Sequence, residues 1–118
     1  MDKNCSVFKA SNLVGKKWTI SILLELYKGT EKWKRYNHIK GKLQGITPKM
    51  LSARLKELEK AGIIIKRVDS TVIPIKSEYS LTKHGEEFID VIRHIKTWSL
   101  KFSPNKSCNA KDCKNCEF

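Results

Sequence analysis

The 118-residue sequence lacks any apolar run near the roughly 20 residues of a membrane span, and its start lacks the features of a secretory signal. It also lacks a nucleophile elbow, a glycine-rich phosphate loop and a pair of catalytic carboxylates. We therefore expect a cytoplasmic protein that has no membrane partner and is not an enzyme.

Acidic residues are scarce, because 12 Asp and Glu accompany 24 Lys and Arg and leave a net charge of +12. Residues 31–60 alone contain nine basic and three acidic residues. This balance favours an anionic partner, nucleic acid first and lipid headgroups second. The alternative is a lysine-rich composition that only keeps the protein in solution.

Length and periodicity predict one domain, residues 1–103, followed by a cysteine-rich tail, residues 104–118. Apolar residues at helical intervals predict three helices in the first part of the chain. They are a short helix up to about Val14, a scaffold helix from Lys17 to Tyr27, and a third helix from Trp33 to Leu43.

The next helix has clear boundaries, since Thr47 is suited to the N-cap, Pro48 to the first turn and Gly62 to the stop. At about 100° per residue, one side of this helix is made of leucines and the other side mostly of lysines. The two sets are Leu51, Leu55 and Leu58 against Lys49, Ala53, Lys56 and Lys60. We expect the helix to dock through its leucines and to present its lysines outward.

Residues Ile63 to Val68 and Lys76 to Leu81 have the composition and alternation of a β-hairpin. Thr82 is expected to cap a long last helix that runs to Phe102. The predicted fold class is therefore mainly α with a small β-hairpin (α+β). The order of elements is that of a winged helix-turn-helix with extra N- and C-terminal helices.

In such a fold the helix after Thr47 enters the major groove N-terminus first, and the hairpin forms a wing at the minor groove. Lys49 and Ser52 are candidates for base contacts and Ala53 for a thymine methyl, while the other cations would hold phosphates. The expected DNA-binding residues are Lys34, Arg35, Thr47, Lys49, Ser52, Ala53, Lys56, Lys66, Arg67 and Lys76. Arg54 borders the leucine side, where capping a carbonyl or pairing with an acid is at least as suitable.

The last helix carries more apolar surface than the core of a small domain needs, which indicates a homodimer. Ile89 and Leu100 lie well away from its main apolar face. The expected interface residues are Phe88, Val91, Ile92, Ile95, Trp98 and Phe102. The alternative is that the first helix of the same chain covers this surface.

Several segments resemble the HxlR-type, MarR-like transcriptional regulators. They are VGKKWT (14–19), RYNHI (35–39), GITPKMLSARLKELEKAGII (45–64), EYSLTKHG (78–85) and the late Trp98. The resemblance runs from about Cys5 to Phe102, and Lys16 departs from it where the family usually has a second glycine. It implies a homodimer that binds a pseudo-palindromic double-stranded DNA operator, with the N-terminal segment and the last helix at the dimer interface.

Some relatives of this type sense electrophiles or oxidants through a cysteine placed like Cys5. A thiol that lies near a helix start and near Lys3 and Lys9 is expected to form the thiolate more readily. An unreactive thiol at an interface is the alternative.

The tail is outside the resemblance. Its cysteines could join Cys5 in a four-thiolate zinc site, but a regulatory disulfide and an inert reduced tail stay open. The candidate metal ligands are Cys5, Cys108, Cys113 and Cys116.

The resemblance favours a sequence-specific transcriptional regulator. The rival function is that of a winged helix that binds RNA or another protein through the same basic face, without operator specificity.

Overall fold

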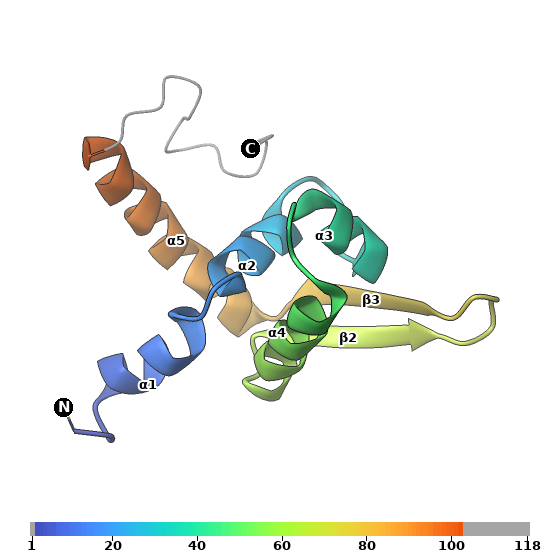
Figure 1. Ribbon diagram of the computed structural model, residues 1–118, viewed down its shortest axis with the longest axis horizontal. Coiled ribbons are helices and arrows are strands. Elements are labelled where there is room, and N and C mark those ends of the chain that lie inside the picture. The colour runs from blue at the N-terminus through green and yellow to red at the C-terminus, as the bar shows by residue number, and fades with distance from the viewer. Residues whose placement is uncertain (1, 103–118) are drawn as a thin grey trace.

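The computed structural model describes residues 2–102, and its helices pack around one end of a small antiparallel sheet whose hairpin projects away from them (Figure 1). The helices are α1 (Ser6–Val14), α2 (Thr19–Tyr27), α3 (Tyr36–Lys42), α4 (Pro48–Lys60) and α5 (Lys83–Phe102). The strands are β1 (Lys34–Arg35), β2 (Ile64–Asp69) and β3 (Lys76–Leu81), in the sheet order β1-β3-β2. The predicted winged helix-turn-helix is confirmed in its fold class and in its order of helices and hairpin.

The core is built around α2, which contacts α3, α5 and β3. Ile22 and Leu23 of α2 are completely buried. The same apolar cluster contains the three leucines of α4, the strand residue Ile64 and two isoleucines of α5. Because each later helix and both strands of the hairpin contribute to this one cluster, the positions of these elements are set by the side chains they place there.

Both ends of α4 form as the sequence predicts. At its start, Thr47 Oγ1 accepts a hydrogen bond from Met50 N at 3.1 Å. Just beyond its end, Gly62 has a φ of +77°, a left-handed conformation that costs glycine little. The predicted cap of α5 is also confirmed, since Thr82 Oγ1 accepts from Gly85 N at 3.2 Å.

Thr82 also joins the end of α4 to the start of α5. Its hydroxyl lies 2.7 Å from the carbonyl oxygen of Gly62, to which it donates. Gly85 packs so closely on the carbonyl of Ile63 that a Cβ would have no room there. The turn after α4 is therefore fixed against the first turn of α5, and this contact sets where the hairpin begins.

The segment before α3 differs from the prediction of one helix starting at Trp33. Lys34 and Arg35 form β1 instead, paired with Tyr79 and Glu78 of β3. So short a strand is stable only because β3 offers it a partner. The local sequence contains no signal for that pairing.

Lys34 is buried rather than exposed, so the expectation that it holds a phosphate is wrong. Only 5% of the residue is accessible. Its ammonium donates to the carbonyl oxygens of Glu25 and Leu26, each at 2.9 Å, and to that of Lys28. These carbonyls end α2 and have no partners within the helix, so the lysine caps the scaffold helix.

The expected dimer face of α5 is wrong at one position. Ile92 is 4% exposed, and Ile89, expected to lie away from the main apolar face, is 1% exposed, so these two residues pack inside the protomer. Phe88 is partly buried against the same core. The exposed apolar residues of α5 are Val91, Ile95, Trp98 and Phe102.

The first helix does not cover this surface. None of the residues of α1 is buried, and Trp98 is 62% exposed. In Figure 1, α1 and the C-terminal half of α5 diverge from α2 in different directions. The alternative in which α1 covers the late part of α5 is therefore excluded.

Lys34→Met should lower the free energy of unfolding by about 1–3 kcal/mol, because the carbonyls that end α2 lose their buried donor. Chemical denaturation measures the change. Lys32→Met is the matched control, since Lys32 is exposed two residues earlier. Equal stability of the two variants would contradict the capping role.

Candidate nucleic-acid interface

The two sides of α4 divide as expected. Leu51, Leu55 and Leu58 are at most 2% exposed and anchor the helix in the core. The opposite side is open to solvent along its whole length. Its exposed residues are Lys49, Ser52, Lys56 and Lys60, together with Thr47 at the N-cap, while Ala53 is half-buried. The helix therefore presents a cationic and hydroxyl-bearing surface, with the exposed acid Glu59 at its edge.

Tyr36, at the first position of α3, holds the exposed start of α4. Its hydroxyl donates to the carbonyl oxygen of Pro48 at 3.3 Å and lies 3.4 Å from Ser52 Oγ. This contact fixes the angle between the two helices of the helix-turn-helix. Sequence reasoning used Tyr36 only as an apolar position, because nothing local shows that its hydroxyl reaches a residue 16 positions away.

Arg54 has the structural role that its place beside the leucines favoured. Its Nε donates to the carbonyl oxygen of Lys17 at 3.0 Å, just before α2. Its Nη1 pairs with Glu57 at 3.2 Å, and Lys16 pairs with the same carboxylate oxygen at 3.2 Å. Lys16 thus supplies an ion pair that links the α1–α2 connection to α4.

The basic residues of the hairpin differ in their surroundings. Lys66 lies over the Tyr79 ring, with its Nζ 5.9 Å from the ring centroid. The guanidinium of Arg67 stacks 4.2 Å from the centroid of Trp33. Its Nε also donates to Glu78 at 3.2 Å. The charge of Arg67 is therefore partly balanced, and its orientation is fixed by residues from two other segments.

The predictions did not include Trp33 and Glu78. Glu78 faces Arg67 directly across the two strands, a pairing that the hairpin register could have indicated. Trp33 precedes β1, so its stacking on Arg67 depends on the unpredicted strand. Lys76 pairs in register with Asp69 and is partly exposed.

Asp69 ends β2 and closes the base of the hairpin loop. Hydrogen bonds from the Thr71 hydroxyl and the Thr71 backbone N–H lower the pKa of its carboxyl group, and Lys76 and Arg67 lower it further. Asp69 is therefore ionised at neutral pH. The hairpin thus alternates basic residues with acids that balance part of their charge.

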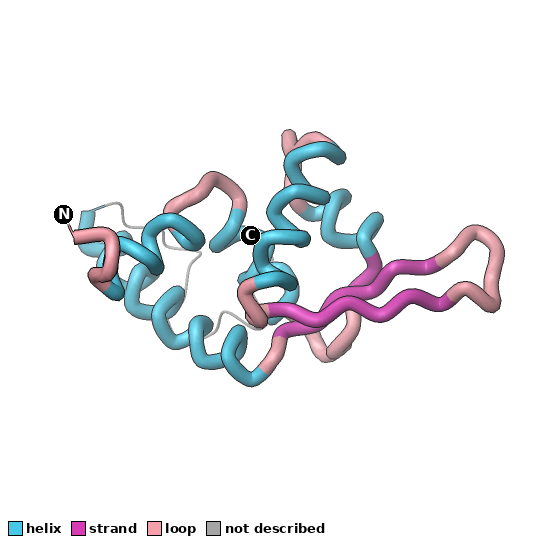
Figure 2. Tube along the Cα trace, turned by 90° about the horizontal axis from the view of Figure 1, so that it is seen from below, coloured by secondary structure: helices cyan, strands magenta, loops and turns pink. Residues whose placement is uncertain are grey.

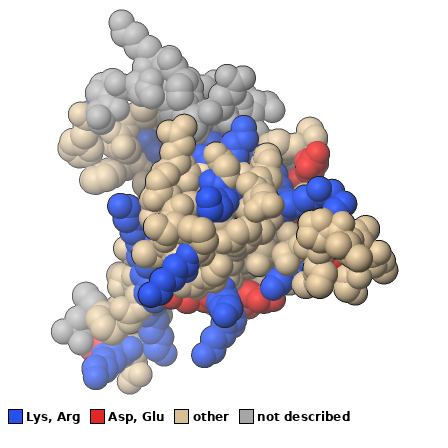
Figure 3. All heavy atoms as spheres, turned by 45° about the vertical axis from the view of Figure 1, so that its right-hand side comes forward, with Lys and Arg blue, Asp and Glu red and all other residues tan. Residues whose placement is uncertain are grey.

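The surface that includes these elements is strongly basic. In a view turned from that of Figure 1, Lys and Arg spread over the visible face while Asp and Glu show only in small areas (Figure 3). Arg35 at the start of α3 is exposed, whereas Lys34 beside it is not. Of the ten expected DNA-binding residues, all except Lys34 are at least partly accessible.

Comparison with known proteins places this arrangement in a family. The model of the HxlR-like helix-turn-helix family matches residues 13–107. The chain belongs to this family. The uncharacterized HTH-type transcriptional regulator YdzF of Bacillus subtilis (strain 168) is 42% identical over 89 residues, which cover 75% of this chain and 79% of YdzF.

Solved structures agree with the assignment of an HxlR-like protein. The reduced form of the transcriptional regulator YodB from B. subtilis has a TM-score of 0.70 and 32% identity, covering 85% of this chain and 95% of YodB. The redox regulator HypR in its oxidized form has a TM-score of 0.71 and 31% identity, covering 82% and 96%. This HxlR-like chain is therefore a helix-turn-helix transcriptional regulator and not an enzyme.

Of the four cysteines of this HxlR-like regulator, only Cys5 lies within the described residues 2–102. Cys5 stands at the N-cap of α1 as a free, partly exposed thiol. Cys108, Cys113 and Cys116 lie outside the described residues, so the four-thiolate zinc site stays a prediction. Within residues 2–102, no group of three or more metal-ligating side chains comes together, and no helix is both long and apolar enough to cross a membrane.

Proposed function

We propose that this cytoplasmic HxlR-like regulator binds a pseudo-palindromic operator in double-stranded DNA as a homodimer. In this proposal α4 lies in the major groove and the hairpin reaches the minor groove. The observation that carries it is the division of α4, whose leucines are buried while Lys49, Ser52 and Lys56 are exposed. A major groove about 12 Å wide accepts one helix with such a surface.

The position of each residue on α4, α3 or the hairpin indicates whether it would contact a base or a phosphate. Lys49 and Ser52 lie in the first turns of α4, where side chains reach base edges. Arg35, Lys56, Lys66 and Lys76 are placed further out and suit phosphate contacts. Arg67 suits a defined contact at the wing, because Trp33 and Glu78 already orient its guanidinium.

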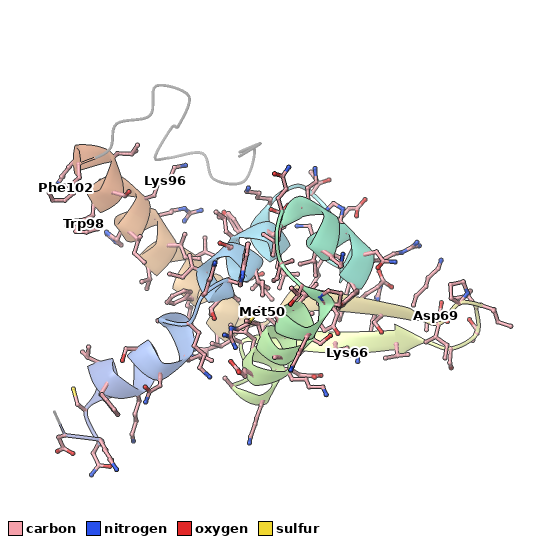
Figure 4. The ribbon with its side chains drawn as sticks, viewed as in Figure 1. Met50, Lys66, Asp69, Lys96, Trp98 and Phe102 are labelled. Carbon is pink, nitrogen blue, oxygen red and sulfur yellow. The ribbon has the colours of Figure 1, made fainter. Side chains whose placement is uncertain are left out.

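The exposed apolar surface of α5 is the basis for proposing a second copy of the chain in a homodimer. Trp98 and Phe102 contact each other, with ring centroids 5.0 Å apart, and are 62% and 71% exposed (Figure 4). Val91 and Ile95 continue this apolar surface along the helix, and Val7 of α1 is exposed as well. Two such surfaces related by a two-fold axis would bury each other and place two α4 helices on one duplex.

Thiol control is the second element of the proposal. Cys5 is partly exposed at the start of α1, on the element expected to join the dimer interface. HypR, which this chain resembles, is described as a redox regulator. Oxidation of the two Cys5 thiols of a dimer to one disulfide, with an added oxidant such as diamide taking up the two electrons and two protons, would alter the packing of α1 and thus the spacing of the two α4 helices.

Lys49→Ala should relax base preference at one operator position, because it removes a base contact. Lys76→Ala should weaken binding to all duplexes alike and flatten the slope of log K against log salt by about one unit. Selection from a random duplex pool, followed by titrations at several salt concentrations, measures both. Lys101→Ala, at the far end of α5, is the control for loss of one charge.

Equal losses on every sequence from Lys49→Ala and Lys76→Ala would contradict these roles. An RNA-binding module would instead bind a structured RNA competitor as tightly as the selected duplex. A protein-interaction module would select no duplex at all.

Trp98→Glu should convert the dimer to a monomer and should reduce affinity for the full operator more than for a half-site. The reason is that burying a carboxylate in an apolar interface is costly. Sedimentation velocity measures the first effect. Thr97→Glu places the same charge on another side of α5 and should leave a dimer. A dimeric Trp98→Glu protein would refute the proposed interface.

Oxidation with diamide should reduce operator affinity by about tenfold, within the usual range of coupling between sites, and reduction should restore it. Cys5→Ser should abolish the response. A variant with Cys108, Cys113 and Cys116 all changed to serine should keep it. The opposite pattern would assign the response to the tail cysteines rather than to Cys5.

A further inference from the structure

The loop at the tip of the hairpin is apolar, although turns are usually made of polar residues and glycine. Residues 70–75 read Ser-Thr-Val-Ile-Pro-Ile and contain no charged side chain. Ile73 is 100% exposed and Ile75 is 64% exposed. In both Figure 1 and Figure 2 the loop projects beyond all the helices, so no other described segment of this chain covers it.

The base of the loop is held in a defined conformation. Asp69 Oδ1 accepts hydrogen bonds from Thr71 N at 3.0 Å and from Thr71 Oγ1 at 2.5 Å. Lys76 stands opposite Asp69 in the strand register. Figure 4 shows Asp69 near the tip and Lys66 nearer the body of the protein. The apolar residues are therefore carried at the end of a supported two-stranded ribbon.

Cations occupy the hairpin behind the tip but not the tip itself. Lys66, Arg67 and Lys76 all belong to the paired strands. The far end of the hairpin is correspondingly free of Lys and Arg in Figure 3. A clamp on phosphates would need cations at the outermost point, whereas apolar residues in front and cations behind are the arrangement of a wedge that enters the minor groove between two phosphate backbones.

We infer that Ile73, Pro74 and Ile75 form an apolar wedge that enters the minor groove of the operator, while Lys66 and Lys76 hold the phosphates on its borders. This inference rests on the proposed function of the regulator. Isoleucine and proline are among the residues that other proteins insert between base steps from the minor groove, where they partly unstack and bend the duplex. Charge complementarity identifies the occupant as nucleic acid, because the chain has a net charge of +12 and the exposed Lys66 lies on the strand behind the tip.

The wedge adds sequence preference at positions that α4 does not reach. The exocyclic amino group of guanine stands in the minor groove, and an apolar side chain cannot accept its hydrogen bond. The base pairs under the wing are therefore A·T or flexible pyrimidine–purine steps. Replacing guanine by inosine removes only that amino group and leaves the major-groove pattern of the base pair unchanged.

The experiment uses the full-length native protein, the operator duplex that it selects from a random pool, and Ile73→Ser. The substitution is at a fully exposed position, so it leaves the fold intact. Ile65→Ser is the matched control, because Ile65 is an exposed isoleucine nearer the base of the same hairpin. Affinity at several salt concentrations, hydroxyl-radical footprints of the minor groove and dimethyl sulfate footprints of guanine N7 in the major groove are measured for each protein.

Ile73→Ser should lose about tenfold in operator affinity with an unchanged salt slope, because it removes apolar contact and no phosphate contact. Minor-groove protection at the outer positions should disappear while guanine N7 stays protected in the major groove. In an operator variant with G·C pairs placed at those outer positions, replacing guanine by inosine should tighten binding of the native protein and not that of Ile73→Ser. Ile65→Ser should behave like the native protein.

Native affinity and footprint in Ile73→Ser would overturn the wedge and leave the proposed operator binding intact. A loss of self-association in Ile73→Ser, seen by sedimentation, would also overturn it, since the tip would then contact a second copy. A native protein that selects no duplex at all would overturn both the wedge and the proposed function.

Discussion

Burial of the leucines on α4 is the interaction on which the rest of the structure depends. Leu51, Leu55 and Leu58 lie in the central apolar cluster, and each fully buried leucine contributes about 1.5–3 kcal/mol relative to an exposed one. Rotation of the helix about its axis would expose them and force lysines into the core. The same burial that stabilises the domain therefore fixes which residues of α4 face solvent.

Polar contacts at the two ends of α4 complete its placement. Tyr36 holds the exposed first turn, and Thr82 ties the carbonyl after the last turn to the start of α5. Arg54 and Glu57 connect the middle of the helix to the residues before α2. A helix held at three points is preorganised, which lowers the entropy lost when a partner binds to it.

The long helix α5 serves two surfaces in succession. Its first half buries Ile89 and Ile92 in the protomer, and its second half leaves Trp98 and Phe102 exposed. A helix that runs past the edge of the core in this way extends the fold without enlarging the core. The direction of the first half of α5 therefore sets where a partner bound to the second half would lie.

The amino-acid sequence by itself determined the order of the helices, the N-caps of α4 and α5, the hairpin and the two sides of α4, because these depend on periodicity and on contacts a few residues apart. The tertiary structure decided the role of Lys34, the existence of β1, the orientation of Arg67 and the inward side of α5. Each of these depends on residues distant in the chain, as when Lys34 Nζ meets the carbonyls of α2. Burial of a lysine becomes favourable only when such unpaired acceptors surround it, and local sequence does not encode that environment.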